Sequence, residues 1–219
     1  ASWARNLYAR LQHNDEMEGL FHALEGRHVD ARLGGDPIRN PEVLPSGHSL
    51  YQFDSRRVPT PIAVRRGRDI ANHVCSAYRA SHDGADPTTI AVVLWGLETT
   101  RTQGETYAQI LSLLGVRSLT PRRPNSPHWE IIPSNELERP RVDVVVTICG
   151  FFRDLFSNLI DELDDILHAV AALDEPADIN PLAARTRQQA QAMRQSGEPE
   201  ERIEALAHAR IFGPPPGQY

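Results

Sequence analysis

The chain has 219 residues, of which 40% are hydrophobic and 24% are charged, so it can bury one large domain or one domain with an appendage. Its formal net charge of −6 disfavours a nucleic-acid-binding surface, and no run of about 18 apolar residues is present that would span a membrane. Two isolated cysteines, Cys75 and Cys149, form neither a metal-binding spacing nor a disulfide framework. This cysteine usage favours a cytoplasmic protein.

All 23 basic residues are arginines, because the sequence contains no lysine. This composition excludes lysine-based chemistry, including Schiff bases and the lysine of a phosphate-binding P-loop. No glycine-rich phosphate-binding fingerprint is present either. We therefore expect that the chain does not itself hydrolyse ATP.

The first part of the chain, residues 1–61, combines helices with an irregular segment. Residues 3–27 predict one or two helices, and their apolar stripe comprises Leu7, Leu11, Met17, Leu20, Phe21 and Leu24. Residues 26–61 have no sustained period and are rich in glycine and proline. They also contain apolar residues that would be unusual in a free linker, namely Leu44, Leu50, Tyr51, Phe53 and Val58. This segment is predicted to be an ordered strap lying across a surface.

Residues 62–175 alternate between helical and strand patterns. A helix is predicted over 64–80, with Ile70, Val74, Ala77 and Tyr78 on one face. A buried strand follows at 89–95, because its continuous apolar character is typical of parallel strands. The next helix ends at Gly115, and its apolar stripe comprises Tyr107, Ile110, Leu111 and Leu114.

Two further strands are predicted at 128–133 and 141–148, and a long helix then runs from 150 to about 172. The inward positions of that helix are Leu155, Leu159, Leu163, Ile166 and Val170. This alternation predicts an α/β fold, a Rossmann-like or flavodoxin-like three-layer core in which strands 89–95 and 141–148 are parallel and close neighbours. Residues 176–219 predict a helical segment, with helices near 182–196 and 199–211, and the ending "GPPPGQY" suggests continuation into a longer protein.

The first candidate site is the polar segment 97–105, which follows the strand at 89–95. In open α/β sheets, ligands bind where chain segments leave the carboxyl ends of the strands. Thr102 and Glu105 also match a capping box, which would by itself explain both residues. Glu98, Thr100 and Arg101 have no such explanation, so the segment is a candidate for ligand binding.

The second candidate lies in "CGFFRDLF", where Arg153 and Asp154 open a helix directly after the strand at 141–148. The alternative is a helix-dipole aspartate with a surface arginine as its partner. If the strands are parallel, both candidate segments lie at the same end of the sheet.

The nine histidines show no zinc-binding spacing. His48 in the strap is the one histidine that we consider a site candidate. His73, His168 and His208 fall within predicted helices, and the acidic run at 161–165 indicates a solvated helix face rather than a metal site.

Five motifs in order resemble the large subunit of the ATP-dependent metal chelatases, the family that contains cobaltochelatase and magnesium chelatase H. They are "GGDPIRNPEVLPSGHSLYQFD", "VVLWGLETTRTQGETYAQILSLLGVR", "ELERPRVDVVVTICGFFRDLFSNLI", "ALDEPADINPLAAR" and "ARIFGPPPGQY". The resemblance covers about residues 23–219. "GFFRD" and "LDEPADINPLAAR" resemble the cobalt enzymes, whereas "GGDPIRNPEVLP" is close to the magnesium enzymes. Glu98-Thr99-Thr100 and Glu138 depart from the family pattern.

The resemblance implies a subunit that holds a tetrapyrrole and receives Co²⁺ or Mg²⁺ as the substrate metal. ATP would be used by a separate AAA+ ATPase subunit, which works with a metal-site-bearing partner subunit. Ring N–H protons must leave as the metal enters, so Glu105 is the predicted catalytic base. The predicted substrate contacts are Trp95, Gly96, Glu98, Thr100, Arg101, Gly104, Gly150, Arg153, Asp154 and His48. Arginine suits the recognition of the peripheral carboxylates of the macrocycle.

Three functions follow as alternatives. The first is a fragment of a cobaltochelatase that inserts Co²⁺ into hydrogenobyrinic acid a,c-diamide during cobalamin biosynthesis. The second is a fragment of magnesium chelatase H, which takes part in inserting Mg²⁺ into protoporphyrin IX. The third is a flavodoxin-like module that binds a tetrapyrrole without catalysis.

Overall fold

The structure is a computed structural model that describes residues 2–38, 41–51, 55–119, 129–215 and 217–218. Contacts divide the chain into two compact units, residues 1–56 and 57–219. The predicted three-part division, with boundaries at residues 61 and 175, stays a prediction.

The first unit contains short elements only. These are α1 (Ser2–Leu11), α2 (Glu16–Leu24), β1 (Arg32–Leu33), the 3-10 turn η1 (Pro41–Val43) and β2 (Ser49–Tyr51), with η2 (Ser55–Arg57) at the boundary. β1 and β2 pair in parallel, so the described part of the predicted strap carries regular backbone structure. The predicted strap residue Phe53 lies outside the described residues.

The predicted apolar stripe of the first helices does not become a core. Its exposed members are Leu11, Met17, Leu20, Phe21 and Leu24. These side chains are exposed because the described part of this unit offers few buried partners, chiefly Val43 and Gly19. The helical period therefore predicts the two helices, but it carries no information on whether their apolar side chains are buried.

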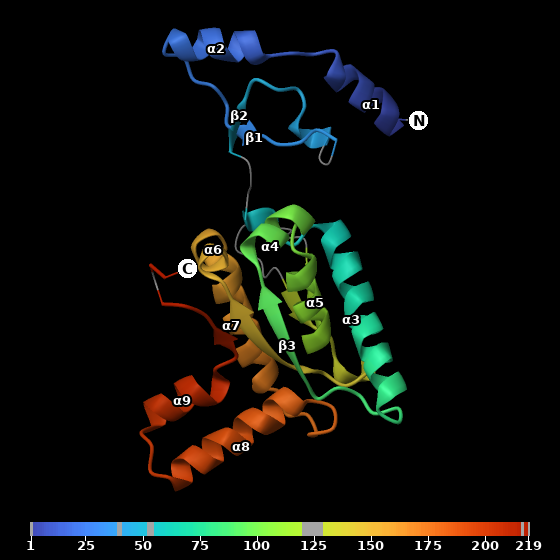
Figure 1. Ribbon diagram of the computed structural model, residues 1–219, viewed down its shortest axis with the longest axis vertical. Helices are drawn as coiled ribbons and strands as arrows, with labels where there is room; N and C mark the ends of the chain where they lie inside the picture. Colours follow the sequence, from blue (N-terminus) through green and yellow to red (C-terminus); the bar gives the residue numbers. More distant parts are fainter. Residues whose placement is uncertain (1, 39–40, 52–54, 120–128, 216, 219) are drawn as a thin grey trace. The chain divides into compact units, whose positions relative to one another are not determined.

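The second unit contains the α/β fold that the sequence predicts. Its elements are α3 (Pro61–Ser81), β3 (Thr89–Leu94), α4 (Gly96–Thr102), α5 (Glu105–Leu114), β4 (Val116–Ser118), β5 (Trp129–Ile131), η3 (Ser134–Glu136), β6 (Asp143–Ile148), α6 (Gly150–Leu155), α7 (Ser157–Ala171), α8 (Pro181–Gln195), α9 (Glu200–His208) and β7 (Ile211–Phe212) (Figure 1). The three-stranded sheet has the order β3-β6-β7, and both pairings are parallel. The predicted adjacency of the two central strands is confirmed.

Helices α5 and α7 both lie behind the sheet in Figure 1, on the same face of it. The Tyr107 hydroxyl on α5 donates a hydrogen bond to Glu162 Oε1 on α7 at 2.8 Å, which joins the two helices directly. This arrangement follows from right-handed crossovers, because strands added successively in one direction place their helices on one face. The described residues thus supply two of the three predicted layers, the sheet and one helical layer.

Helix α3 packs against α5 through small residues. A Cβ on Gly67 would lie 2.6 Å from the backbone nitrogen of Gln109, so the two helices approach closely at this point. The buried positions of α3 are Ala63, Gly67, Ala71 and Cys75. The apolar face predicted for this helix is not the buried one, because Ile70 and Tyr78 are exposed. Small residues allow close helix contact and outweigh the larger apolar side chains beside them.

Two predicted boundaries also differ from the structure. Residues 97–105 were expected to form a loop, but residues 96–102 form α4. Threonine lowers helix propensity, yet here the Thr100 hydroxyl donates a hydrogen bond to the Gly96 carbonyl at 2.9 Å within the helix. The predicted helix from 150 to 172 is broken at Phe156, whose dihedral angles are −125° and 34°. The buried Phe156 ring stacks on Phe152, and Leu155 is exposed rather than inward.

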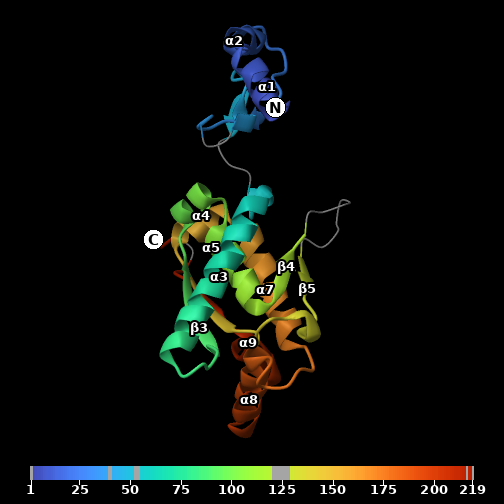
Figure 2. The ribbon, with the colours of Figure 1, turned by 90° about the vertical axis from the view of Figure 1, so that its right-hand side faces the viewer.

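Three short strands differ from the predicted pattern in their pairing or their position. The short strand expected at 128–133 is β5, and it pairs antiparallel with β4 in a separate ribbon (Figure 2). Residues 211–212 were assigned to the end of a helix region but form β7 instead. β7 therefore adds the third strand to the parallel sheet.

Candidate functional site

The carboxyl ends of β3 and β6 meet at one edge of the sheet, because Leu94 is directly paired with Ile148. Helix α4 begins at Gly96 and helix α6 begins at Gly150, each within two residues of its strand. The structure thus brings together the two segments that the sequence singled out.

Gly96 allows α4 and α6 to pack against each other at this edge. A Cβ on Gly96 would lie 2.1 Å from Phe151 Cδ1 and 3.0 Å from the backbone nitrogen of Phe152. Gly104 serves the turn before α5, since its φ is 95° and a Cβ would lie 2.6 Å from Val58 Cγ1. Gly96 and Gly104 therefore serve the backbone geometry at this edge of the sheet, and a ligand would depend on them only through that geometry.

Three large apolar side chains are exposed around Gly96, and we call them the sheet-end patch. Trp95 is 59% exposed, Leu97 is 74% exposed and Phe151 is 43% exposed. The Phe151 ring lies against Gly96, the residue between Trp95 and Leu97 in the sequence. Grouped exposed apolar residues of this size mark interaction or ligand sites more often than single ones do.

Glu105 opens α5 but does not complete the predicted capping box. The Thr102 hydroxyl accepts a hydrogen bond from the Glu105 backbone N–H at 3.2 Å, as a cap would. The Glu105 carboxylate does not return to Thr102. Its Oε1 instead accepts a hydrogen bond from Arg66 on α3 at 2.7 Å, and the side chain is 17% exposed. Capping alone therefore does not account for the acidic group at this position.

Glu98 is less well satisfied than Glu105. The Thr102 hydroxyl donates to Glu98 Oε1 at 2.9 Å, which fixes the carboxylate along α4. Glu98 Oε2 is buried, as is the hydroxyl of Thr99, and among the described residues neither has a hydrogen-bond partner. Buried polar atoms without partners are rare and costly, so they point to a water, an ion or a ligand group.

The two predicted arginine clamps differ in their surroundings. Arg101 is exposed on α4 and makes no hydrogen bond or ion pair with another described residue. Arg153 instead donates to the carbonyl oxygens of Pro214 and Pro215, at 2.8 and 2.6 Å, and pairs with Asp154 at 2.9 Å. Arg153 therefore holds the segment after β7 against α6, which the sequence alone did not indicate.

His48 belongs to the first unit. Its Nε2 lies 3.8 Å from Asp15 Oδ2, and its buried Nδ1 has no hydrogen-bond partner among the described residues. Across the described ranges, no group of three or more His, Cys, Asp or Glu side chains is arranged to hold a metal ion. No helix in those ranges is long and apolar enough to cross a membrane.

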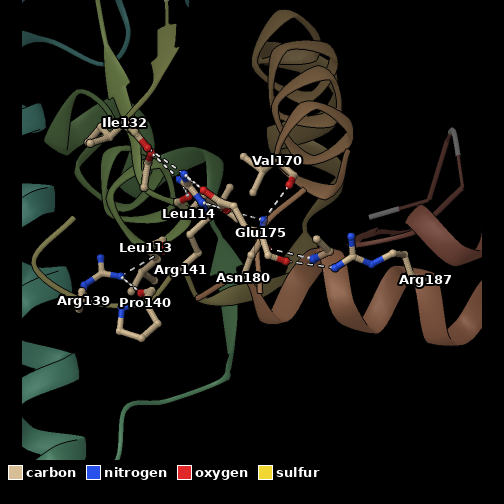
Figure 3. A network of polar contacts seen from close by, with 12 residues as sticks. Leu113, Leu114, Ile132, Arg139, Pro140, Arg141, Val170, Glu175, Asn180 and Arg187 are labelled. Atoms are coloured by element: carbon tan, nitrogen blue, oxygen red, sulfur yellow. Dashed lines mark hydrogen bonds and ion pairs between the residues drawn. The ribbon is translucent and has the colours of Figure 1, made fainter. Parts of the chain in front are cut away.

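A polar network at the opposite end of the sheet was missed by sequence reasoning (Figure 3). The Arg141 side chain is fully buried, and its Nε and Nη2 bind the two Glu175 oxygens at 2.7 and 2.9 Å. Its Nη1 donates to the carbonyls of Leu114 and Gly115, and Nη2 also donates to that of Ile132. All five guanidinium hydrogens are therefore used.

Glu175 and Asn180 complete this network. The hydrogen bonds from Arg141 hold the pKa of Glu175 below its ordinary value, although burial opposes this shift. The Asn180 side chain donates to the Val170 carbonyl and to Glu175, and its oxygen caps α8 at the Ala183 N–H. The network thus joins α5, the β4–β5 ribbon, α7 and α8.

The other charged residues of "RPRVD" also serve the fold. Arg139 binds the carbonyls of Ser112 and Leu113 at the end of α5, and burial lowers the pKa of its guanidinium. Asp143 is buried and pairs with Arg210 at 2.7 Å and with Arg185 at 2.9 Å. The motif had supported only the family resemblance, and its spacing gave no signal of these contacts.

An α/β unit with a polar and apolar site at the carboxyl ends of two parallel strands is the class that this fold and geometry define. The family model described as CobN/Magnesium Chelatase matches residues 1–219. The chain belongs to this CobN/magnesium chelatase family.

Relatives come from both branches of the family. The chain is 42% identical to the aerobic cobaltochelatase subunit CobN of Pseudomonas aeruginosa, over 93% of this chain and 16% of that protein. It is 38% identical to the chloroplastic magnesium-chelatase subunit ChlH of Oryza sativa subsp. indica, over 82% of this chain and 13% of that protein. A structure titled as the catalytic subunit of cobaltochelatase from Mycobacterium tuberculosis matches with a TM-score of 0.70 and 36% identity, covering 94% of this chain and 17% of that one. The chain therefore spans about a sixth of the length of the relatives it matches.

Proposed function

We propose that this chain is the tetrapyrrole-binding part of the large subunit of a cobaltochelatase, and that the macrocycle lies against the sheet-end patch. The observation that carries the proposal is the grouping of Trp95, Leu97 and Phe151 at the carboxyl ends of two parallel strands. A flat, largely apolar macrocycle needs an apolar contact surface of this kind, and aromatic rings are effective at supplying it. Membership of the chelatase family supports the assignment of the ligand.

The polar residues around the patch suit the rest of the macrocycle. Arg101 is exposed, so its guanidinium can bind a peripheral carboxylate in a bidentate manner. We keep Thr100 and Asp154 as predicted contacts, and Arg153 as a residue that also anchors the segment at 214–215. His48 belongs to the first unit and stays a separate prediction.

The chemistry requires the ring N–H bonds of the macrocycle to break as a divalent metal enters. Each nitrogen keeps its electron pair and gives it to the metal, while the proton passes to a carboxylate. Glu105 is the proposed acceptor, and the unpartnered oxygen of Glu98 makes it the next candidate. The metal is the substrate in this reaction.

The remaining parts of the proposal concern the whole protein. ATP would be hydrolysed by a separate AAA+ subunit that acts with a metal-site-bearing partner, and the complex would be cytoplasmic. The absence of lysine, and with it of a P-loop lysine, supports this division of labour.

Cobalt is favoured over magnesium by the motifs "GFFRD" and "LDEPADINPLAAR". The higher identity and coverage for CobN than for ChlH support the same branch. Insertion of Mg²⁺ into protoporphyrin IX remains the second candidate. A non-catalytic tetrapyrrole carrier is the third candidate.

The patch can be tested in the full-length subunit with hydrogenobyrinic acid a,c-diamide as the probe. Trp95→Ala and Phe151→Ala should each weaken binding about tenfold, which corresponds to about 1.4 kcal/mol. Ile70→Ala on α3, which is also partly exposed, is the matched control and should bind normally. Unchanged affinity in both patch variants would place the macrocycle elsewhere. Tighter binding of protoporphyrin IX would favour the magnesium branch.

A further inference from the structure

The side chains of the parallel sheet alternate between a covered and an uncovered face. On the covered face, Val92, Leu94, Val144 and Val146 are buried. The alternate positions on β3 are different, because Val93 is 47% exposed and Ala91 is also exposed. Since successive strand residues point to opposite sides, these two side chains share the face that lies away from α5 and α7.

The neighbouring strands continue this face. Thr147 on β6 is paired with Val93 on β3 and with Phe212 on β7, so the three side chains lie in one row across the sheet. Thr147 is exposed and Phe212 is 50% exposed. We call the surface made by Ala91, Val93, Thr147 and Phe212 the outer sheet face.

An uncovered outer face is unusual for this kind of sheet. Parallel sheets occur almost only with both faces covered, usually by helices. In Figure 1 the outer face is turned toward the viewer, and no helix of the described second unit lies in front of β3. The face is also uncharged, so burying it against apolar side chains leaves no ionised group unpaired.

We infer that the outer sheet face is an interface, covered in the full-length subunit by an amphipathic helix from the part of the polypeptide outside residues 1–219. The chain spans only about a sixth of its relatives' length, so ample polypeptide is available to supply a third layer. A helix is the element that packs on parallel sheets, and its apolar stripe matches the row of apolar residues. This inference rests on the fold and on family membership, and it does not depend on the proposed function.

The location of this interface bears on the ligand site. Ala91, Val93 and Trp95 are alternate residues, so their side chains lie on the same side of the chain. Trp95 therefore extends the outer sheet face to the sheet-end patch. A helix on the outer face would form the second wall of a cleft at the carboxyl ends of the strands. Such a cleft is the usual ligand position in open α/β sheets.

Maleimide labelling of single cysteines tests the inference. The variants carry Cys149→Ser, so that the buried Cys75 is the native cysteine that remains in this chain and sets the baseline labelling. Thr147→Cys reports on the outer sheet face. Gln191→Cys, on the exposed side of α8, is the accessible control. Both engineered cysteines should label at similar rates in the chain of 219 residues. In the full-length subunit without macrocycle, labelling of Thr147→Cys should be about tenfold slower or more, because it requires local opening of the interface.

Four results would overturn the inference. Equal labelling of Thr147→Cys in both proteins would leave the face open. Protection already present in the chain of 219 residues would mean that this chain covers its own sheet. Protection that grows with protein concentration would assign the face to a second copy, and protection that appears only with added hydrogenobyrinic acid a,c-diamide would assign it to the ligand. Matching melting curves for all variants establish that the substitutions leave the fold intact.

Discussion

The amino and carboxyl ends of the same parallel sheet are built in opposite ways. At the amino end, Arg141 and Asp143 are buried; Arg141 uses all five guanidinium hydrogens, and each Asp143 oxygen pairs with an arginine. At the carboxyl end, Trp95 and Leu97 are exposed and Glu98 has a buried oxygen without a described partner. One end therefore satisfies its own groups, whereas the other leaves apolar surface and polar atoms available.

This contrast separates two uses of charged residues that look alike in sequence. A guanidinium with all its hydrogens bonded inside the protein cannot also bind a ligand, so Arg141 serves the fold. An arginine that has no described polar partner, such as Arg101, can bind a ligand. The number of unused donors and acceptors, rather than residue type, distinguishes the two ends.

The largest expected effect comes from removing the ion pair between Arg141 and Glu175 at the amino end of the sheet. Arg141→Met should lower the free energy of unfolding by about 3–5 kcal/mol, because it leaves Glu175 partly buried without its partner. Arg117→Met removes a surface pair with Glu130 and should cost only about 0–1 kcal/mol. Urea denaturation of the purified chain measures both values. Similar losses in the two variants would contradict the assignment of Arg141 to the fold.

At the carboxyl end, Gly96→Ala tests whether the close packing of α4 and α6 supports the ligand site. Its new methyl group would overlap the Phe151 ring and approach the Phe152 backbone, so α4 and α6 must separate. We expect a loss of about 1–3 kcal/mol in the free energy of unfolding, as for other overpacked sites. Macrocycle affinity in the full-length subunit should fall in parallel, and fluorescence titration measures it. An unchanged affinity would separate this contact from the ligand site.

Glu105→Gln tests chemistry with little change in stability. Its pair with the exposed Arg66 contributes little, so melting should be nearly unchanged. Metal insertion by the full-length subunit with its ATPase partners should fall about tenfold, or about 1.4 kcal/mol of barrier. Glu98→Gln, assayed alongside, compares the two carboxylates. Normal insertion in Glu105→Gln would restrict this residue to packing of α5 on α3, and Glu98 would take the proposed role.

The smallest effect concerns a histidine pair. His168 on α7 and His208 on α9 stack with ring centroids 4.6 Å apart. Burial first, and then the charges of His168 and Arg210, lower the pKa of His208, while Glu204 and Asp164 oppose this shift. The neutral ring is therefore favoured in the folded state, and its contribution to stability is present above the ordinary histidine pKa of 6.5.

That contribution is lost as the pH falls through 6.5 toward the lower pKa of His208 in the fold. Thermal melting across this window should show a modest decline for the wild-type chain and a shallower one for His208→Gln. The matched control is His73→Gln on α3. Equal slopes in the His208→Gln variant and the wild type would show that the stacked pair does not respond to protonation.

The elements of the second unit were largely predictable, because period and strand composition are local signals. Strands 89–95 and 141–148 could be read from their continuous apolar runs, and their parallel pairing follows from the helix between them. Strand β7 could not be read in this way, since it is two residues long and is defined by its pairing with β6. The buried face of α3 could not be read from the sequence for a similar reason, because the close approach at Gly67 depends on the surface of α5.

The candidate site was predictable in position but not in detail. The topological rule located both segments at one sheet edge, and the structure places Gly96 against Phe151 there. The roles of Arg153 and Arg141 could not be foreseen, because their partners lie far along the chain, at 214–215 and at 175. Long-range partners leave no periodic signal in a single sequence.

The late position of β7 has a consequence for the order of folding. Its pairing partner Val146 is synthesised 65 residues earlier than Ile211, and helices α8 and α9 emerge from the ribosome between them. Among the described strands, β6 therefore has one neighbour and a free edge during translation until residue 212 appears. Such an edge can pair with other nascent chains, and Arg210, which binds the buried Asp143, arrives together with the strand that closes it.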